Sequence, residues 1–374
     1  MKKCILVPDS FKGTMSSLEV SQIMKNRILK RFPDCQVIAI PVADGGEGTV
    51  DCLLEALHGD KISLTTKGPF LDSAESFYGR VGDLAIIEMA ASAGFHLAQE
   101  KLNPLRTTTY GVGELIRHAV NQGAKEIILG LGGSCTNDGG AGMAAALGTR
   151  FIDGKGVEFI PVGGTLGEVV EIDNSRTRDF LKDVRVIAMC DIDNPLFGET
   201  GAAYVFAPQK GATPVQVDYL DQQLRIFSST IKTSLGVDVS KLSGGGAAGG
   251  MGAGVKAFLN GELKSGIDTV LDLVGFENLL DNCDWVFTGE GKLDYQSLSG
   301  KVVIGVGHRA MKEGVPVIAV VGEREEGLQD LYRQGVARVY ETSSQRKDFE
   351  DIRAHCREDL RGTMDKILGE IPNV

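Results

Sequence analysis

The sequence predicts an α/β protein with more than one domain and with parallel sheets. Short, continuously apolar segments alternate with amphipathic segments along the chain, which is typical of parallel sheets covered by helices on both faces. The chain has 374 residues, which is longer than the chains that fold around a single hydrophobic core, so we expect two domains.

The predicted strands are short apolar runs, and they lie at residues 3–8, 36–42, 84–90, 125–131, 185–192, 283–289, 315–322 and 337–342. The first predicted helix, 16–32, has Leu18, Ile23 and Ile28 on one side. Further helices are predicted at 47–59, 111–123, 213–236 and 301–314. Gly59 ends one of them, and Pro214 lies in the first turn of another, as helix ends and starts favour.

Composition and charge narrow the classes of function. The formal net charge of -11 argues against nucleic acid as the main partner, because binding a polyanion needs a basic face. The seven cysteines are scattered without a CxxC pair, which is typical of reduced thiols. The chain has no run of eighteen apolar residues, and its first residues lack the long apolar stretch of a signal peptide. We therefore expect a cytoplasmic protein with no membrane segment.

The stretch GLGGSCTNDGGAGM, residues 130–143, is the richest candidate for a binding site. Six of its fourteen residues are glycine, and it joins a predicted strand to a helix that begins near Asp138. Glycines at such a place let backbone N–H groups approach an anion, and the helix N-terminus adds positive potential. The alternative is a tight connection whose glycines only permit close packing. Ser134, Thr136 and Asn137 in the same turn favour a ligand site.

Acidic residues follow three other predicted strands. They lie in PVADGGEGT (41–49) with Asp44, in MCDIDNPLFG (189–198) with Asp191, and in TGEGKLDYQSLSGK (288–301) with Asp294. An isolated acidic turn is usually a helix cap. Several of them at the carboxyl ends of strands, beside glycine loops and lysines, indicate Mg²⁺ and phosphate binding.

The common nucleotide motifs are absent or misplaced. The chain contains no GxxxxGK[ST], so a Walker-type loop is excluded. GVGHRA, residues 305–310, matches GxGxxA but lies inside a predicted helix and not directly after a strand.

Several long motifs together resemble the glycerate kinase family of the bacterial type that acts in the glyoxylate and galactarate pathways. They are VPDSFKGTMSS, PVADGGEGT, EMAASAG, TTTYGVGELI, GLGGSCTNDGGAGM and TGEGKLDYQSLSGKVVIGV, and the resemblance covers essentially the whole chain. It implies ATP-dependent phosphorylation of D-glycerate to 2-phosphoglycerate. It also implies two α/β domains, one of them Rossmann-like with a parallel sheet and discontinuous in sequence. We expect the Rossmann-like domain at 1–65 and 278–374, and the inserted second α/β domain at 66–277.

Phosphoryl transfer requires positioning and charge stabilisation, which suggests a role for each candidate residue. As catalytic residues we expect Asp44, Asp138, Asp294 and Lys292, with Asp44 or Asp138 orienting the attacking hydroxyl and helix capping as the alternative for both. The metal ligands would be Asp191 and Asp294. A cation should meet the substrate carboxylate, so substrate binding is assigned to Lys12, Ser10 and Arg106. Binding of ATP is assigned to Gly132, Gly133, Ser134, Thr136, Gly250 and Gly252.

Other functions stay open at this point. An NAD-dependent hydroxy-acid oxidoreductase would use a similar architecture, but it predicts GxGxxG directly after an early strand. A small-ligand binder without enzyme activity would not need carboxylates at several strand ends. A kinase that gives 3-phosphoglycerate is a further alternative. The expected partners are ATP, Mg²⁺ and D-glycerate, with neither nucleic acid nor membrane, and a homodimer is allowed for.

Overall fold

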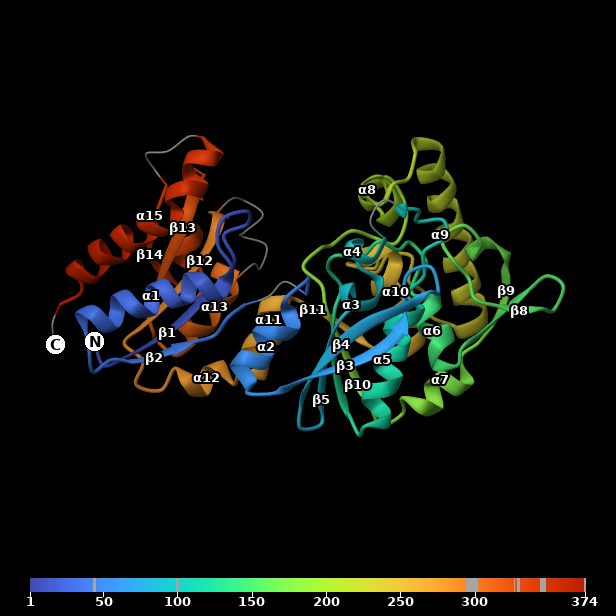
Figure 1. The fold of residues 1–374 in the computed structure, drawn as a ribbon, viewed down its shortest axis with the longest axis horizontal. Helices are drawn as coiled ribbons and strands as arrows, with labels where there is room; N and C mark the ends of the chain where they lie inside the picture. The colour runs from blue at the N-terminus through green and yellow to red at the C-terminus, as the bar shows by residue number, and fades with distance from the viewer. Residues whose placement is uncertain are drawn as a thin grey trace. The chain divides into compact units, whose positions relative to one another are not determined.

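The structure is a computed structural model, and it describes residues 1–42, 45–98, 101–293, 302–325, 327, 330–343 and 348–372. The chain divides into two compact units, shown in Figure 1. Unit 1 consists of Met1–Ala43, Glu55–Leu57 and Ser265–Val374, and unit 2 consists of Asp44–Leu54 and His58–Lys264. Within the described residues, no helix combines the length and the apolar character needed to cross a membrane.

Unit 1 contains a five-stranded, fully parallel sheet in the order β14-β13-β12-β1-β2. Its elements are β1 (Lys3–Pro8), α1 (Ser17–Arg31), β2 (Gln36–Ala39), α11 (Gly266–Leu273), α12 (Phe276–Leu279), β12 (Trp285–Leu293), α13 (Val302–Lys312), β13 (Val317–Arg324), α14 (Asp330–Arg333), β14 (Val336–Glu341) and α15 (Phe349–Glu370). The order reverses between β1 and β12, because β2 lies on the other side of β1. In open α/β sheets this switch point is where ligands bind.

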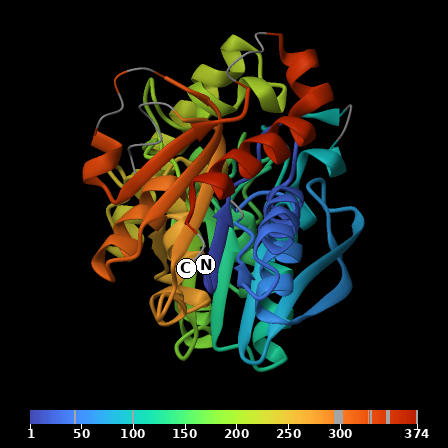
Figure 2. The ribbon, with the colours of Figure 1, turned by 90° about the vertical axis from the view of Figure 1, so that its left-hand side faces the viewer.

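Helices cover both faces of this sheet because its strands are apolar on both sides. Leu6, Phe287 and Val320 belong to the core beneath α1 and α15, which pack side by side (Figure 2). Val321 belongs to a separate core on the other face, together with Val303 of α13. The result is the three-layered, Rossmann-like unit that the sequence predicts, and strands from the two ends of the chain share its sheet.

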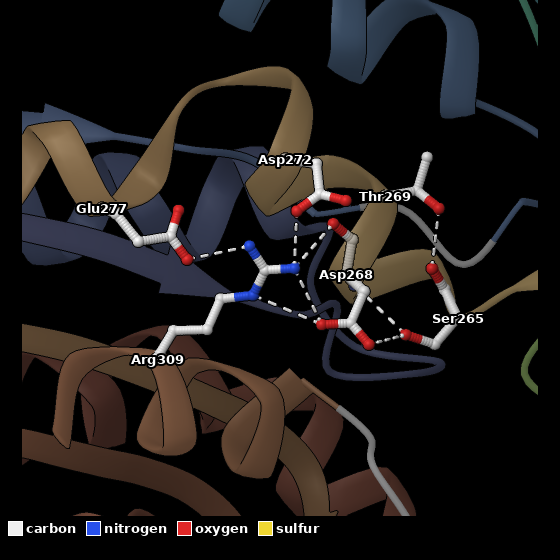
Figure 3. A network of polar contacts seen from close by, with 6 residues as sticks. All are labelled: Ser265, Asp268, Thr269, Asp272, Glu277 and Arg309. Atoms are coloured by element: carbon white, nitrogen blue, oxygen red, sulfur yellow. Dashed lines mark hydrogen bonds and ion pairs between the residues drawn. The ribbon is translucent and has the colours of Figure 1, made fainter. Parts of the chain in front are cut away.

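Arg309 joins three helices of unit 1 (Figure 3). Its guanidinium on α13 lies 3.0 Å from Asp268 and 2.7 Å from Asp272, both on α11, and 3.0 Å from Glu277 on α12. The Arg309 side chain is only 15% exposed, so burial strengthens these contacts. The GVGHRA motif lies within α13, and it is therefore part of a helix and not a dinucleotide loop.

Unit 2 contains a six-stranded sheet in the order β11-β10-β6-β5-β4-β3 and a small sheet in the order β8-β7-β9. Its strands are β3 (Asp60–Lys67), β4 (Ser73–Val81), β5 (Leu84–Glu88), β6 (Glu126–Gly130), β7 (Arg150–Asp153), β8 (Glu158–Phe159), β9 (Val169–Asp173), β10 (Arg185–Met189) and β11 (Glu262–Lys264). Its helices are α2 (Thr49–Leu57, whose last residues are grouped with unit 1), α3 (Ala90–Ala93), α4 (Phe95–Ala98), α5 (Tyr110–Asn121), α6 (Ala141–Leu147), η2 (Leu166–Glu168), α7 (Ser175–Phe180), α8 (Ala202–Phe206), η3 (Pro208–Lys210), α9 (Pro214–Leu235) and α10 (Ala247–Leu259).

The large sheet is mixed, which corrects the expectation of purely parallel sheets. Strands β5, β6, β10 and β11 are parallel, whereas β3 and β4 pair antiparallel at one edge. The sequence analysis missed β3 and β4, as well as the small sheet. Exposed residues alternate with half-buried ones along most of β3, so it lacks the continuous apolar run of a strand that is buried on both faces.

The helix boundaries follow local signals in the sequence. Thr213 forms a capping box with Gln216 at the start of α9, directly before Pro214. The helix ends at Gly236, which has a positive φ of 73°. The α/β class, the two units and the discontinuous Rossmann-like unit are confirmed. The boundaries expected at 65/66 and 277/278 stay a prediction.

Candidate functional site

Two glycine-rich loops of unit 2 lie backbone against backbone beyond the end of β6. The first is the 130–140 loop, and the other contains Gly45 and Gly46. The N–H of Gly132 donates to the carbonyl of Gly45 at 2.8 Å. A Cβ added to Gly132 would lie 2.5 Å from the Cα of Gly46, and one added to Gly130 would lie 2.4 Å from the carbonyl oxygen of Gly45. Glycine is therefore required at these positions because the other loop occupies the space that a side chain would need.

The polar residues of the 130–140 loop are buried. Ser134 is 4% exposed, and Thr136 and Asn137 are both 0% exposed. The ammonium of Lys210, at the end of η3, donates to the Ser134 hydroxyl at 2.9 Å and to the Thr136 carbonyl at 2.6 Å. Lys210 is itself only 2% exposed. Burial lowers its pKa from 10.5 to about 8, against the opposing effects of Cys135 and Asp138.

Asp138 joins the starts of two helices. Its carboxylate is 0% exposed and accepts hydrogen bonds from the N–H of Thr109 at 2.7 Å, of Gly140 at 3.1 Å and of Gly142 at 3.2 Å, and from the Thr109 hydroxyl at 2.9 Å. Thr109 precedes α5, and Gly140 precedes α6. Burial raises the pKa of Asp138, although these donors oppose the shift. The contacts favour the capping interpretation of Asp138 over the catalytic one.

The second glycine-rich segment packs on the first. Helix α10 has three consecutive left-handed residues, 248–250, directly after its first residue, and they form a kink. A Cβ on Gly250 would lie 2.8 Å from the Cα of Gly139 in the first loop. A Cβ on Gly252 would instead lie 2.2 Å from the carbonyl oxygen of Gly244, within the second segment itself. Of the two glycines predicted to bind ATP here, Gly250 therefore contacts the first loop, while Gly252 packs locally.

Two residues of unit 2 that the sequence analysis selected have exposed side chains: Arg106, the predicted cation for the substrate carboxylate, and Asp191, a predicted metal ligand. Arg106 directly precedes Thr107, whose hydroxyl donates to the carbonyl of Cys135 in the 130–140 loop at 2.9 Å. Asp191 follows the end of β10 and also has an exposed side chain. Within the described residues, no group of three or more histidines, cysteines and acidic residues could hold a metal ion.

The predicted site residues of unit 1 lie at its sheet switch point. Ser10 follows the end of β1, and its N–H donates to Asp9 at 2.6 Å. The N–H of Lys12 lies beside Gly291 of β12, where a Cβ would approach its nitrogen to 3.2 Å. Lys292, the next residue of β12, is half exposed and pairs with Glu325 at 2.9 Å. The structure thus brings these three residues to adjacent strand ends. Asp44 and Asp294 lie outside the described residues.

Comparison with known proteins identifies the family. The sequence profile of the glycerate kinase family matches residues 4–371. The chain belongs to the glycerate kinase family.

Members of the glycerate kinase family from several bacteria are similar to this chain over nearly its full length. A glycerate kinase of Bacillus cereus is 43% identical over 98% of this chain and 97% of its own length. The glycerate 2-kinase of Escherichia coli K12 is 43% identical over 90% of both chains. A crystal structure of a protein described as glycerate kinase 2, from Salmonella typhimurium LT2, superposes with a TM-score of 0.86 at 40% identity and covers 98% of this chain and 97% of its own.

Membership of the glycerate kinase family confirms the resemblance found in the sequence motifs and the prediction of a kinase. The roles assigned to individual residues stay predictions. The structure adds two buried charged residues that the sequence analysis did not select, Lys210 and Glu88. Glu88 ends β5, is 3% exposed, and accepts a hydrogen bond at 3.1 Å from the N–H of Val50 in the first turn of α2. An acidic residue that ends an apolar strand was a usable signal for Glu88, whereas Lys210 had none.

Proposed function

We propose that this protein transfers a phosphoryl group from ATP to D-glycerate, with Mg²⁺, and releases 2-phosphoglycerate. The observation that carries the proposal is the full-length match to the glycerate kinase family. The position of the new phosphate rests on the similarity to the E. coli protein, which is named glycerate 2-kinase. The oxidoreductase alternative is disfavoured because the matching family is a kinase family and because the GxGxxA stretch at 305–310 lies inside α13. A cytoplasmic location and a homodimer stay expectations.

The 130–140 loop is the proposed phosphate site. It follows a parallel strand, leads into α6 and contains Gly132, Gly133 and Ser134. Gly133 has a positive φ of 73°, so it can turn backbone N–H groups in a direction that an L-residue rarely allows. Backbone N–H groups of a glycine-rich turn favour a phosphate over a neutral group, whereas the N–H groups of Gly140 and Gly142 at the start of α6 are already bonded to Asp138.

Substitution of Gly132 by alanine tests whether this loop binds the nucleotide. The new Cβ would lie 2.5 Å from the Cα of Gly46, so the two loops must separate. We expect the free energy of unfolding to fall by about 1–3 kcal/mol and the affinity for ADP, measured by calorimetry, to fall as well. Gly154→Ala is the matched control, because a Cβ there has nothing within 4 Å. Unchanged ADP affinity in a destabilised Gly132→Ala protein would leave Gly132 with a packing role alone.

The carboxylate of glycerate needs a cation, and its attacking hydroxyl needs an acceptor. Lys12, together with Ser10, lies at the switch point of unit 1, and exposed Arg106 provides the cation of unit 2. We assign the orienting carboxylate to Asp44 and not to Asp138, because the Asp138 carboxylate is buried and accepts five hydrogen bonds from within the chain. Lys292 would offset charge on the transferring group.

The described residues fit Mg²⁺ held mainly by substrate oxygens. Mg²⁺ in kinases usually takes one or two carboxylates, with waters and phosphate oxygens completing its shell. The exposed carboxylate of Asp191 matches that chemistry, and Asp294 is the second proposed ligand. When bound, the ion would neutralise charge on the phosphates.

Release of ADP from ATP tests the proposed reaction. We expect ADP only when D-glycerate is present, and we expect EDTA to abolish its release. Phosphorus NMR of the product should show 2-phosphoglycerate. A 3-phosphoglycerate signal would overturn the position of transfer, and no ADP with any short hydroxy acid would overturn the kinase function.

A further inference from the structure

Lys210 is a buried cation without a carboxylate partner in the described part of the chain. Its two hydrogen-bond acceptors, the Ser134 hydroxyl and the Thr136 carbonyl, are neutral. Burying a charge that forms no direct ion pair is costly even though Asp138 opposes the lowering of the Lys210 pKa, and an apolar residue of similar size is often at least as stable. A residue that lowers stability in this way at a candidate site points to a functional role.

The chemistry of the ammonium group fixes the role of the Ser134 hydroxyl. A lysine ammonium can only donate, so in the bond to Lys210 the oxygen of Ser134 must accept. The hydroxyl proton of Ser134 is then left to donate elsewhere. Among the described residues, this bond from Lys210 is the hydrogen bond that the structure gives the Ser134 hydroxyl. Lys210 therefore leaves Ser134 as a donor for a group outside the protein.

The neighbouring side chains show the same surplus of hydrogen-bonding capacity. The Thr136 hydroxyl and both polar atoms of the Asn137 amide are buried, and none of them has a hydrogen-bond partner among the described residues. Buried polar atoms are rarely left unsatisfied in native proteins, so such a group calls for an explanation. A polar ligand at this loop would provide it.

We propose that Lys210 is a positioning residue of the phosphate loop, where it holds Ser134 so that the serine hydroxyl donates to an anionic oxygen of the bound nucleotide. This inference rests on the proposed function. It extends that function by assigning a role to Lys210 and by stating that the Ser134 hydroxyl donates to the ligand. The ligand class is a phosphate-bearing substrate, because a hydroxyl donor polarised by an ammonium favours an anionic acceptor.

The pH dependence separates this role from a structural one. The titratable groups that face Lys210 are Cys135 and Asp138. Because the folded pKa of Lys210, about 8, lies below its ordinary value of 10.5, the folded protein binds fewer protons than the unfolded chain between these values. Stability should therefore rise with pH across this range. Activity should fall above about pH 8, since a neutral amine can also accept the Ser134 proton.

A double-mutant cycle tests the inference in the full-length protein. Lys210→Met and Ser134→Ala should each lower kcat/KM for ATP by about ten- to a hundredfold, the expected loss of a hydrogen bond to a charged group. The kcat/KM of the double variant should be no lower than that of the less active single variant, because both substitutions remove the same hydrogen bond. Both single variants should also lose the decline in activity above pH 8. Thr149→Val is the control, because it removes another buried hydroxyl of unit 2, one that bonds Asn174 and Thr177.

The outcomes separate the two proposals. Additive losses, or a Ser134→Ala enzyme that keeps the decline above pH 8, would overturn the role of Lys210 while the kinase remains active. A wild-type protein that releases no ADP would overturn the proposed function instead. Ser134→Ala keeps the test valid if Lys210→Met fails to fold, because its pH profile alone decides whether Lys210 acts through the serine.

Discussion

Asp138→Ala is expected to lower the free energy of unfolding by about 3–5 kcal/mol. The substitution leaves the buried N–H groups of Thr109, Gly140 and Gly142 without their acceptor. These groups belong to the starts of α5 and α6, so both helices lose a cap in one step. Chemical denaturation followed by circular dichroism measures the effect.

Two further variants show whether Asp138 has a chemical role. Asp138→Asn should also be destabilised, because the amide nitrogen turns a donor toward backbone N–H groups that need an acceptor. Asp153→Ala is the control, since Asp153 also accepts two backbone N–H groups but lies in an exposed turn, where water replaces it. A stably folded Asp138→Asn protein with a greatly reduced rate would favour the catalytic interpretation over capping.

Asp294→Asn is expected to lower the rate on the order of a hundredfold or more and to shift the Mg²⁺ requirement. Asp294 comes directly after the last residue of β12 in the sequence. Asparagine is a good helix cap but a poorer Mg²⁺ ligand than aspartate, so the substitution separates the two interpretations. Steady-state kinetics over a range of Mg²⁺ concentrations, with a thermal melt, would measure both effects.

The melting temperature is the internal control for Asp294→Asn. A lost metal ligand leaves the stability of the apo protein nearly unchanged while the rate falls. Full activity with ordinary Mg²⁺ dependence would remove Asp294 from the metal site. A lower melting temperature with a normal rate would assign it to helix capping.

The sequence alone was sufficient for the α/β class, the family and the buried parallel strands, but it missed the helices α10 and α15. Continuous apolar runs predicted β1, β5, β6, β10, β12 and β13, because strands buried on both faces need apolar residues at every position. Pro214 in the first turn predicted the start of α9, and the structure adds a capping box at the same place. The glycine-rich loop was also visible, because six of the fourteen residues at 130–143 are glycine.

Only the tertiary structure decided what those glycines and polar residues contact. Gly132 is required because the backbone of Gly46 lies against it, and the two residues are far apart in the sequence. Strands β3 and β4 were missed because an edge pair with one exposed face carries a weaker pattern. Nothing in the sequence predicted the burial of Lys210, since a lysine is usually exposed. Only the tertiary structure places its ammonium against Ser134 and Thr136. Local patterns in a sequence report the periodicity of burial, whereas the partner of a buried charge is set by long-range packing.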